Sequence, residues 1–431
     1  MAREVDLRTG AKADRKPTVV DDRPVVTRER GTKATAWWVV LTLVNSGFAI
    51  IAAVVPLRRI LADGDVNTWW SYTANEWLIN YGDGAVRRGL GGEILRRLPL
   101  DSDRTAVTVV VAGFAVLVPL LFAVLVQLVI RSRRTGWPLL LWGIPGGFLL
   151  GTWQIAWLPI SDTQVLFATR KEYAFAAVLL ALAIALRLTA RVMLLAVIFG
   201  LVMGAGALVH EALVLPFAVA GSALVIFAQR NGLRLRTLAA IWLPVIAAVV
   251  VAVALPDPDS TSIQRQWSAL DEQTRSWLGG EIGWPMRWLG LDLPYAVKAT
   301  AATMADRDML LPWLALCLFS VGWTLAALRL VDTSGRAFRA SLAVGAGVTV
   351  AVLPLVALGI DWGRFAVVVA TCTAIACLGR QLHDPPESRA AGNGAGPIVL
   401  AAVLVGLLAL IGVPEAGPPL GGLRGDAPAS D

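Results

Sequence analysis

The chain has 431 residues, of which 56% are hydrophobic and only 16% are charged, and its mean hydropathy is +0.66. Soluble domains carry about 25% charged residues, so this composition excludes an ordinary soluble domain and indicates a protein that crosses a membrane several times. Much of the net charge of +7 lies in the N-terminal tail and in short basic loops, which membrane topology explains without a nucleic-acid partner.

Residues 1–35 form a highly charged tail with no apolar h-region, so we expect a disordered cytoplasmic segment and no cleaved signal peptide. Residues 36–413 are expected to form an all-α transmembrane bundle of about 11 spans, because apolar runs of about 20 residues recur along them. Residues 414–431, rich in proline and glycine, are expected to be a disordered extracytoplasmic tail. The predicted spans are 36–57, 105–130, 138–159, 174–190, 192–209, 211–228, 237–255, 309–328, 340–358, 365–379 and 396–413.

The orientation follows from short basic connections at 131–134, 229–236 and 329–339, which share one side of the bundle with the basic tail. The positive-inside rule places that side in the cytoplasm. Since the dominance of Ala, Val, Leu and Gly suggests a GC-rich bacterial genome, we expect a multi-pass protein of a bacterial plasma membrane. The outer segments are then the loops 58–104, 160–173, 256–308 and 359–364, together with the His210-Glu211 turn. Their unusual polar sequences all face one side, which favours a single shared extracytoplasmic site.

The first outer loop contains the stretch NYGDGAVRRGLGGE, with two adjacent arginines, five glycines and two carboxylates. Guanidinium groups bind phosphate oxygens in a bidentate manner, and glycines let backbone N–H groups approach a phosphate closely. We therefore assign Arg87 and Arg88, with Tyr81, to substrate binding. Asp83 or Glu93 would act as a general base or hold a metal. The alternative is that the arginines bind lipid head groups and the carboxylates neutralise them.

Tryptophan-rich segments in the long first and fourth outer loops predict interfacial helices. In TWWSYTANEWLI, Trp69 or Trp70, Thr73 and Trp77 fall at helical spacing, with Glu76 beside them. Tryptophan prefers the membrane interface, and sugar stacking on the indole rings is the alternative. In the fourth loop the apolar residues at helical spacing are Ile263, Trp267, Leu270 and Trp277.

Two charged groups lie at or between spans. Arg170, Lys171 and Glu172 stand at the entrance of a span, where they either anchor the helix or bind a substrate phosphate. His210 and Glu211 lie between two apolar runs, where ionisable residues are costly and usually face an interior cavity or a partner. This pair would relay a proton or complete a metal site, or would be a structural hydrogen-bonded pair.

The turn GIDWGRF places Asp361, Trp362 and Arg364 between two spans at the outer mouth. The aspartate and the arginine, three residues apart, would either pair with each other or form a substrate clamp, and we favour the clamp. Just before His210, Gly200 and Gly204 predict close helix packing. The three cysteines lie in apolar runs, with neither a disulfide framework nor metal-ligand spacing.

Four motifs in this order, NYGDGAVRRGLGGE, RKE, HE and DWGR, resemble those of poorly characterised bacterial multi-spanning envelope proteins. That resemblance implies a membrane architecture and a cell-envelope context, with no activity to transfer. The chain is more loosely similar to multi-spanning (GT-C-like) polyprenyl-phosphate-dependent glycosyltransferases and to O-antigen-polymerase-like proteins. The glycosyltransferases have a long first outer loop with acidic catalytic residues, and the O-antigen-polymerase-like proteins have outer loops that carry arginines. Both similarities imply a transferase that uses a lipid-linked sugar.

The preferred hypothesis is a glycosyltransferase or polysaccharide polymerase that acts on the extracytoplasmic face with a polyprenyl-linked sugar donor and a glycan acceptor. The donor phosphates would be held by Arg87, Arg88, Arg170 and Arg364. Membrane lipids and envelope-assembly proteins are further partners, and a divalent metal stays open as a cofactor. The first rival is a transporter or flippase of a lipid-linked or phosphorylated precursor, with proton coupling through His210 and Glu211. The second is a non-catalytic scaffold of an envelope assembly complex.

Overall fold

The structure is a computed structural model. It describes residues 74–82, 88–133, 171–229, 234–255, 259–278, 335–358 and 362–383, with isolated positions between 39 and 60 and between 280 and 301. The predicted spans at 138–159, 309–328 and 396–413 and the two tails lie outside the described residues. So do four of the predicted site residues, which are Asp83, Arg87, Arg170 and Asp361.

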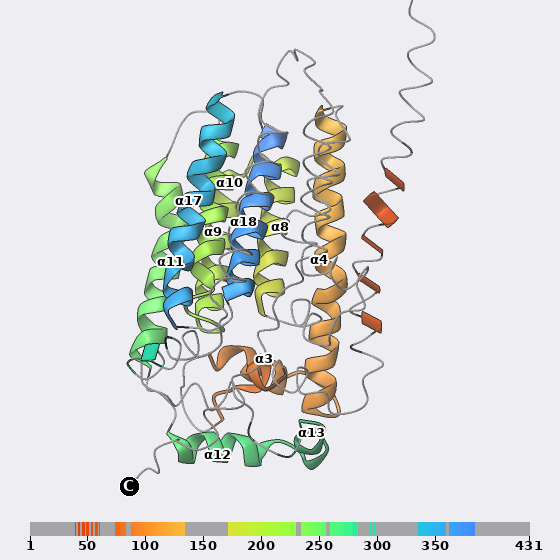
Figure 1. The fold of residues 1–431 in the computed structure, drawn as a ribbon, viewed down its shortest axis with the longest axis vertical. Coiled ribbons are helices and arrows are strands. Elements are labelled where there is room, and N and C mark those ends of the chain that lie inside the picture. The colour runs from red at the N-terminus through yellow and green to blue at the C-terminus, as the bar shows by residue number, and fades with distance from the viewer. Residues whose placement is uncertain are drawn as a thin grey trace, which may run out of the picture. The chain divides into compact units, whose positions relative to one another are not determined.

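Every regular element in the described part of the chain is a helix, in agreement with the predicted all-α class. The helices are α3 (Leu90–Arg96), α4 (Asp103–Arg133), α8 (Lys171–Leu188), α9 (Val192–Ala207), α10 (Val214–Ala228), α11 (Leu235–Ala254), α12 (Ser260–Ala269), α13 (Glu272–Trp277), α17 (Gly335–Leu358) and α18 (Trp362–His383). Figure 1 shows the long helices side by side, with α12 and α13 beyond one end of them and α3 beside the part of α4 that extends past the other long helices.

The hydrophobic core is centred on α10, which packs against α8, α9, α17 and α18. Its sequence VLPFAVAGSALVIFA is apolar on every face, as a helix surrounded by other helices requires, and Phe217 and Leu224 are fully buried. On the outside, α4 packs against α8, and α11 packs against α9. The outward face of α11 exposes Leu243, Val250 and Val253.

The close packing predicted from Gly200 and Gly204 is confirmed at the contact between α9 and α11. A Cβ atom at Gly200 would overlap the carbonyl oxygen of Ala240 and lie 2.8 Å from Cα of Ile241. A Cβ atom at Gly204 would lie 3.0 Å from the carbonyl oxygen of Pro244. The absence of side chains at these two positions is therefore what allows the two backbones to approach.

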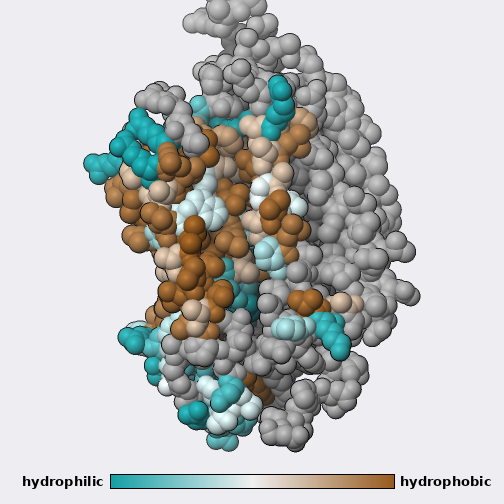
Figure 2. Space-filling view, turned by 90° about the vertical axis from the view of Figure 1, so that its left-hand side faces the viewer, coloured by the Kyte–Doolittle hydropathy of each residue, from teal (hydrophilic) through white to brown (hydrophobic). Residues whose placement is uncertain are grey.

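Three described helices are long and apolar enough to cross a membrane, namely Asp103–Val129, Leu235–Ala254 and Phe338–Leu355, while α9 and α10 are shorter apolar helices. Figure 2 shows hydrophobic residues over most of the described part of one face, with hydrophilic residues gathered toward its two ends. The predicted break at His210-Glu211 is confirmed, because α9 ends at Ala207 and α10 begins only at Val214. Together, these features support a membrane protein.

The pattern of Ile263, Trp267, Leu270 and Trp277 suggested one interfacial helix, and the structure corrects this to two, α12 and α13. The break comes at Asp271, whose carboxylate accepts hydrogen bonds from the backbone N–H of Thr274 (2.7 Å) and from its hydroxyl (2.6 Å) and so caps α13. Trp277 is buried and lies 5.2 Å from the guanidinium of Arg104 in α4. These apolar residues thus pack against the protein itself.

Candidate functional site

Four segments meet at the end of the bundle that carries α3. These are the helical residues 74–78, α3, the beginning of α8 and the turn 208–213 between α9 and α10. The backbone N–H of Gly92 donates to the carbonyl of Ile79 at 3.1 Å, and that of Leu90 donates to the carbonyl of Leu208 at 3.4 Å. Segments more than 100 residues apart in the sequence are thereby joined into one site.

An ion pair between Arg88 and Glu211 crosses this junction. Nη2 of Arg88 donates to Oε1 of Glu211 at 2.8 Å, and Nε donates to Oε2 at 3.0 Å and to Oε1 at 3.2 Å. The side chains are only 23% and 12% exposed, respectively. Fork-to-fork pairing of this kind is the strongest ionic contact that an arginine makes with a carboxylate. It brings together two residues that the sequence analysis assigned to separate parts of the site.

Lys171, the first residue of α8, is completely buried. Its Nζ donates to the carbonyl of Val209 at 3.2 Å and lies 5.8 Å from the ring centre of Trp77. Glu76, Arg88, Glu172 and Glu211 all lie within electrostatic range of it. A buried ammonium group needs such neighbours, because an isolated charge inside a protein is very costly.

His210 completes the group, which we call the charged cluster: Glu76, Arg88, Lys171, Glu172, His210 and Glu211. The imidazole is buried, and its Nδ1 accepts a hydrogen bond from the backbone N–H of Leu213 at 3.4 Å. A neutral His210 with this contact carries its proton on Nε2. The ring is therefore fixed on one side by the turn 208–213.

The sequence analysis placed Glu76 only beside the tryptophans of its loop, and the structure makes it a member of the charged cluster. It is buried beside Trp77 on the helical residues 74–78. Trp77 itself corrects the prediction of an interfacial tryptophan, since its indole is buried and stacks on Phe114 of α4 with the ring centres 6.2 Å apart. The sequence signal for this role is the adjacent polar pair Asn75 and Glu76 on a helix whose other residues are apolar.

Two glycines of NYGDGAVRRGLGGE, Gly89 and Gly92, allow close packing of the chain in the structure, and Gly92 has no free N–H group for a phosphate. A Cβ atom at Gly92 would overlap the carbonyl oxygen of Ile79, and one at Gly89 would overlap the ring of Tyr81. The N–H of Gly92 is already bonded to Ile79. Arg88, just before α3, has a positive φ of 62°, which non-glycine residues rarely adopt. Its unusual backbone directs its side chain to Glu211.

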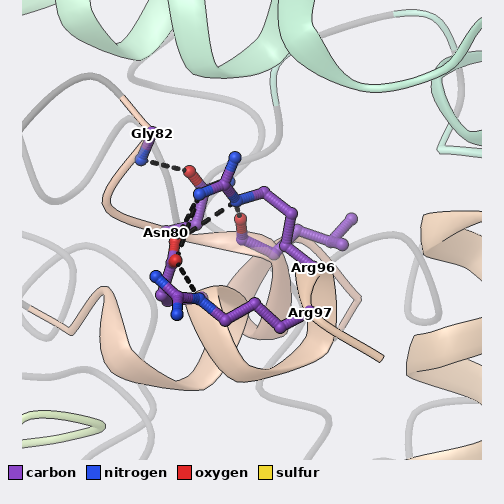
Figure 3. Close-up of polar contacts among 6 residues, drawn as sticks. Asn80, Gly82, Arg96 and Arg97 are labelled. Atoms are coloured by element: carbon purple, nitrogen blue, oxygen red, sulfur yellow. Dashed lines mark hydrogen bonds and ion pairs between the residues drawn. The ribbon is translucent and has the colours of Figure 1, made fainter. Parts of the chain in front are cut away.

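Glu93, predicted as a general base, is held by two arginines of its own helix turn. Nε of Arg97 donates to its carboxylate at 2.7 Å, and Nη2 of Arg96 donates at 3.0 Å, as Figure 3 shows for the two converging guanidinium groups. Hydrogen bonds from Arg96 and then Arg97 lower the pKa of Glu93 below its ordinary value of 4.5. A carboxylate stabilised in this way is a weak base.

We predict a matching pH dependence of stability. Because the pKa of Glu93 is lowered in the folded state, its contribution is complete above the ordinary value of 4.5 and disappears as the pH falls through the folded pKa. The two arginines are largely exposed, so the contribution should be at most about 1 kcal/mol. The thermal unfolding temperature of Glu93→Gln should lie below that of the wild type near neutral pH and converge with it in acid. Glu272→Gln, at an exposed position of α13, is the control. A difference in unfolding temperature between Glu93→Gln and the wild type that is the same at every pH would contradict the lowered pKa of Glu93.

Tyr81, predicted to bind substrate, lies half-buried over Gly89. Burial, and then the negative charge of Glu93, raise its pKa, so it stays a neutral phenol. The turn beside it is closed by Asn80, whose Oδ1 accepts from the N–H of Gly82 at 2.7 Å (Figure 3) and whose Nδ2 donates to the carbonyl of Leu78 at 3.1 Å.

The remaining predicted residues are placed only in part. Trp362 and Arg364 stand in the first turn of α18, while Asp361 lies just outside the described residues. Within the described ranges, no three His, Cys, Asp or Glu residues are grouped so as to hold a metal ion. The described site therefore contains the ion pair of Arg88 with Glu211 and the hydrogen bond of Lys171 to Val209 as its charged contacts with stated partners.

Comparison with known proteins gives a family for the chain. No curated protein and no solved structure matches it significantly. Residues 38–266 match the family described as "Uncharacterised membrane protein Rv1490". The match covers more than half of the 431 residues and includes the whole charged cluster, together with Tyr81 and Glu93. The resemblance to a poorly characterised membrane-protein family is therefore confirmed, and the one to glycosyltransferases gains no support. The chain belongs to the Rv1490 family of membrane proteins.

Proposed function

We propose that the protein is a multi-pass enzyme of the bacterial plasma membrane that transfers a sugar from a polyprenyl-linked donor during cell-envelope glycan assembly, as a glycosyltransferase or polysaccharide polymerase. The site would be the end of the bundle that carries the charged cluster, facing the extracytoplasmic side. The observation that supports this most is the part-buried bidentate contact of Arg88 with Glu211, close to the buried Lys171.

A carboxylate and a phosphate offer the same pair of oxygens to a guanidinium group. Glu211 would therefore hold Arg88 in position while the site is empty, and a donor phosphate would compete for the same fork. Lys171 lies close enough to interact with both charges of this pair and would add a second positive charge. The predicted contributions of Arg87, Arg170 and Arg364 would extend this phosphate site.

In the proposed transfer, the hydroxyl oxygen of the acceptor forms a bond to the anomeric carbon of the donor sugar. The bond from that carbon to the donor phosphate oxygen breaks, and the polyprenyl phosphate or pyrophosphate leaves with the electron pair. The hydroxyl proton passes to a carboxylate. Asp83 is a better candidate for this base than Glu93, because Arg96 and Arg97 already bind the Glu93 carboxylate. His210 and Glu211 would shape the site and assist proton transfer.

The test is a strain that lacks the gene, complemented with wild type, Arg88→Lys or Arg265→Lys. Lysine at position 88 keeps the charge opposite Glu211 but cannot form the bidentate contact, so we expect normal protein levels with loss of function. Arg265 is an exposed arginine of α12 and serves as the matched control. The readout is the profile of polyprenyl-linked glycans and of finished surface polysaccharide.

Accumulation of a discrete, shortened lipid-linked glycan on the outer face, in the deletion strain and in Arg88→Lys, is the expected result. An unchanged glycan profile in the deletion strain would overturn the proposal. Full complementation by Arg88→Lys would overturn the role proposed for the bidentate contact.

A transporter or flippase of a lipid-linked or phosphorylated precursor is the second candidate, and the buried Lys171 favours it. Ionisable groups that face one another inside an apolar bundle are typical of proton relays in transporters. Such a set is formed here by Lys171, His210 and the carboxylates of Glu76 and Glu211. Accumulation of the same glycan on the inner face of the membrane would select this candidate.

A further inference from the structure

A cavity of about 730 Å³ lies at the end of the bundle opposite to the charged cluster. α8 begins in the cluster at Lys171, and its last residues, Leu186 to Leu188, line this cavity. The turn between α8 and α9, the end of α10, the first turn of α11 and the end of α18 form the rest of its wall. Its volume is within the range of small-molecule sites, about 300–1,000 Å³.

The cavity is strongly basic. Its lining includes four arginines and a histidine, which are Arg187, Arg191, Arg234, Arg236 and His383, and no acidic residue among the described lining residues. The four arginine side chains are exposed and make no hydrogen bond or ion pair within the described part of the chain. Two of these guanidinium groups belong to α8 and α11, and the other two to the N-cap positions of α9 and α11. Together they line a hollow without a described counter-charge.

Two helices also begin at this cavity without the usual caps. Neither α9 nor α11 has a side-chain cap at its N-terminus or an acidic residue in its first turn. The N–H groups of Val192 and Thr237 are already bonded to Ala190 and Arg234, and the partial positive charge of each helix N-terminus still favours an anion. A hydrogen bond of 2.8 Å from Nε2 of Gln229 to Oγ1 of Thr237 joins the end of α10 to the first turn of α11, and both residues line the cavity.

Exposed apolar side chains stand directly beside these charges. Leu188 is 73% exposed, and Met193 and Leu194 are 45% and 48% exposed. All three belong to the cavity lining. A soluble phosphate compound has no apolar part to bury against these side chains. A phospholipid has a phosphate for the arginines and adjacent acyl chains for the apolar side chains.

We propose that this cavity binds the phosphate headgroup of an anionic phospholipid, with its acyl chains against Leu188, Met193 and Leu194. The arginines neutralise the phosphate, and the first turns of α9 and α11 donate backbone hydrogen bonds to it. The site is separate from the charged cluster and does not depend on the function proposed for that cluster. It lies on the side that the sequence analysis assigns to the cytoplasm.

The test uses native mass spectrometry of the full chain, released from micelles that contain equal amounts of phosphatidylglycerol and phosphatidylcholine. The wild type should retain phosphatidylglycerol selectively. Arg191→Gln/Arg234→Gln should bind it roughly 30-fold more weakly, since each basic residue near an anionic lipid contributes about a factor of five. Arg265→Gln/Arg275→Gln removes the same charge from α12 and α13 at the other end of the bundle and should bind like the wild type.

Equal retention of the two lipids by the wild type would overturn the proposal. Equal losses in the two double variants would also overturn it, because they would reveal a general effect of charge. Inorganic phosphate or pyrophosphate is added in a second arm. Displacement of the lipid by either anion at micromolar concentration would assign the cavity to a soluble phosphate compound instead.

Discussion

Truncation of Arg88 to alanine is expected to lower the free energy of unfolding by about 3 kcal/mol, the lower end of the range for a broken buried ion pair. The lower end applies because the Arg88 side chain keeps 23% exposure. The loss arises mainly from the Glu211 carboxylate, which would stay buried without its bidentate partner. Glu211→Ala should cost a similar amount, because it leaves the guanidinium without its carboxylate.

A double variant separates the pairing from the packing. In Arg88→Ala/Glu211→Ala no charge is left uncompensated, so the double variant should be more stable than the sum of the two single effects predicts. Thermal unfolding in detergent, followed by circular dichroism, measures all three variants. Arg265→Ala, at an exposed position of α12, should change the stability by less than about 0.5 kcal/mol. Strictly additive effects of the single and double substitutions would contradict a coupled pair.

Gly92→Ala is expected to destabilise the protein by about 3 kcal/mol, the upper end of the range for overpacking. The added Cβ atom would overlap the carbonyl oxygen of Ile79 and lie 2.6 Å from its carbonyl carbon. These are backbone atoms, which cannot rotate away as a side chain can. The hydrogen bond from Gly92 N–H to Ile79 would be strained as well, and it joins α3 to the segment that carries Glu76.

The neighbouring Gly91 provides a control of opposite sign. A Cβ atom at Gly91 would lie 3.5 Å from Cγ1 of Val209, an ordinary contact. Alanine forms helices more readily than glycine, so Gly91→Ala should leave α3 unchanged or stabilise it by up to about 1 kcal/mol. The measurement is again the unfolding temperature of the purified variants. Equal unfolding temperatures for Gly91→Ala and Gly92→Ala would contradict the packing of α3 against residue 79.

Some site contacts were readable from the sequence but were not predicted. Arg96 and Arg97 follow Glu93 by three and four residues, the spacing at which side chains meet on a helix. Had the helix LGGEILR been recognised, the pairing of Glu93 and its weakness as a base would have followed. The break before α13 is similar, because an aspartate followed by an acidic first turn, here Asp271 and Glu272, is a typical helix start.

The sequence by itself determined the helices of the described bundle, including the break near His210 and the close contact at Gly200. Each of these depends on local properties, namely the length of an apolar run, a polar interruption or a pair of small residues on one helix face. Only the tertiary structure decided the partners. Arg88 meets Glu211 across 123 positions of the sequence, Lys171 reaches Val209 and lies over the ring of Trp77, and Glu76 lies within electrostatic range of Lys171. The physical reason is that an ion pair depends on which helix ends lie together after packing, and apolar helices pack by shape, which hydropathy does not encode.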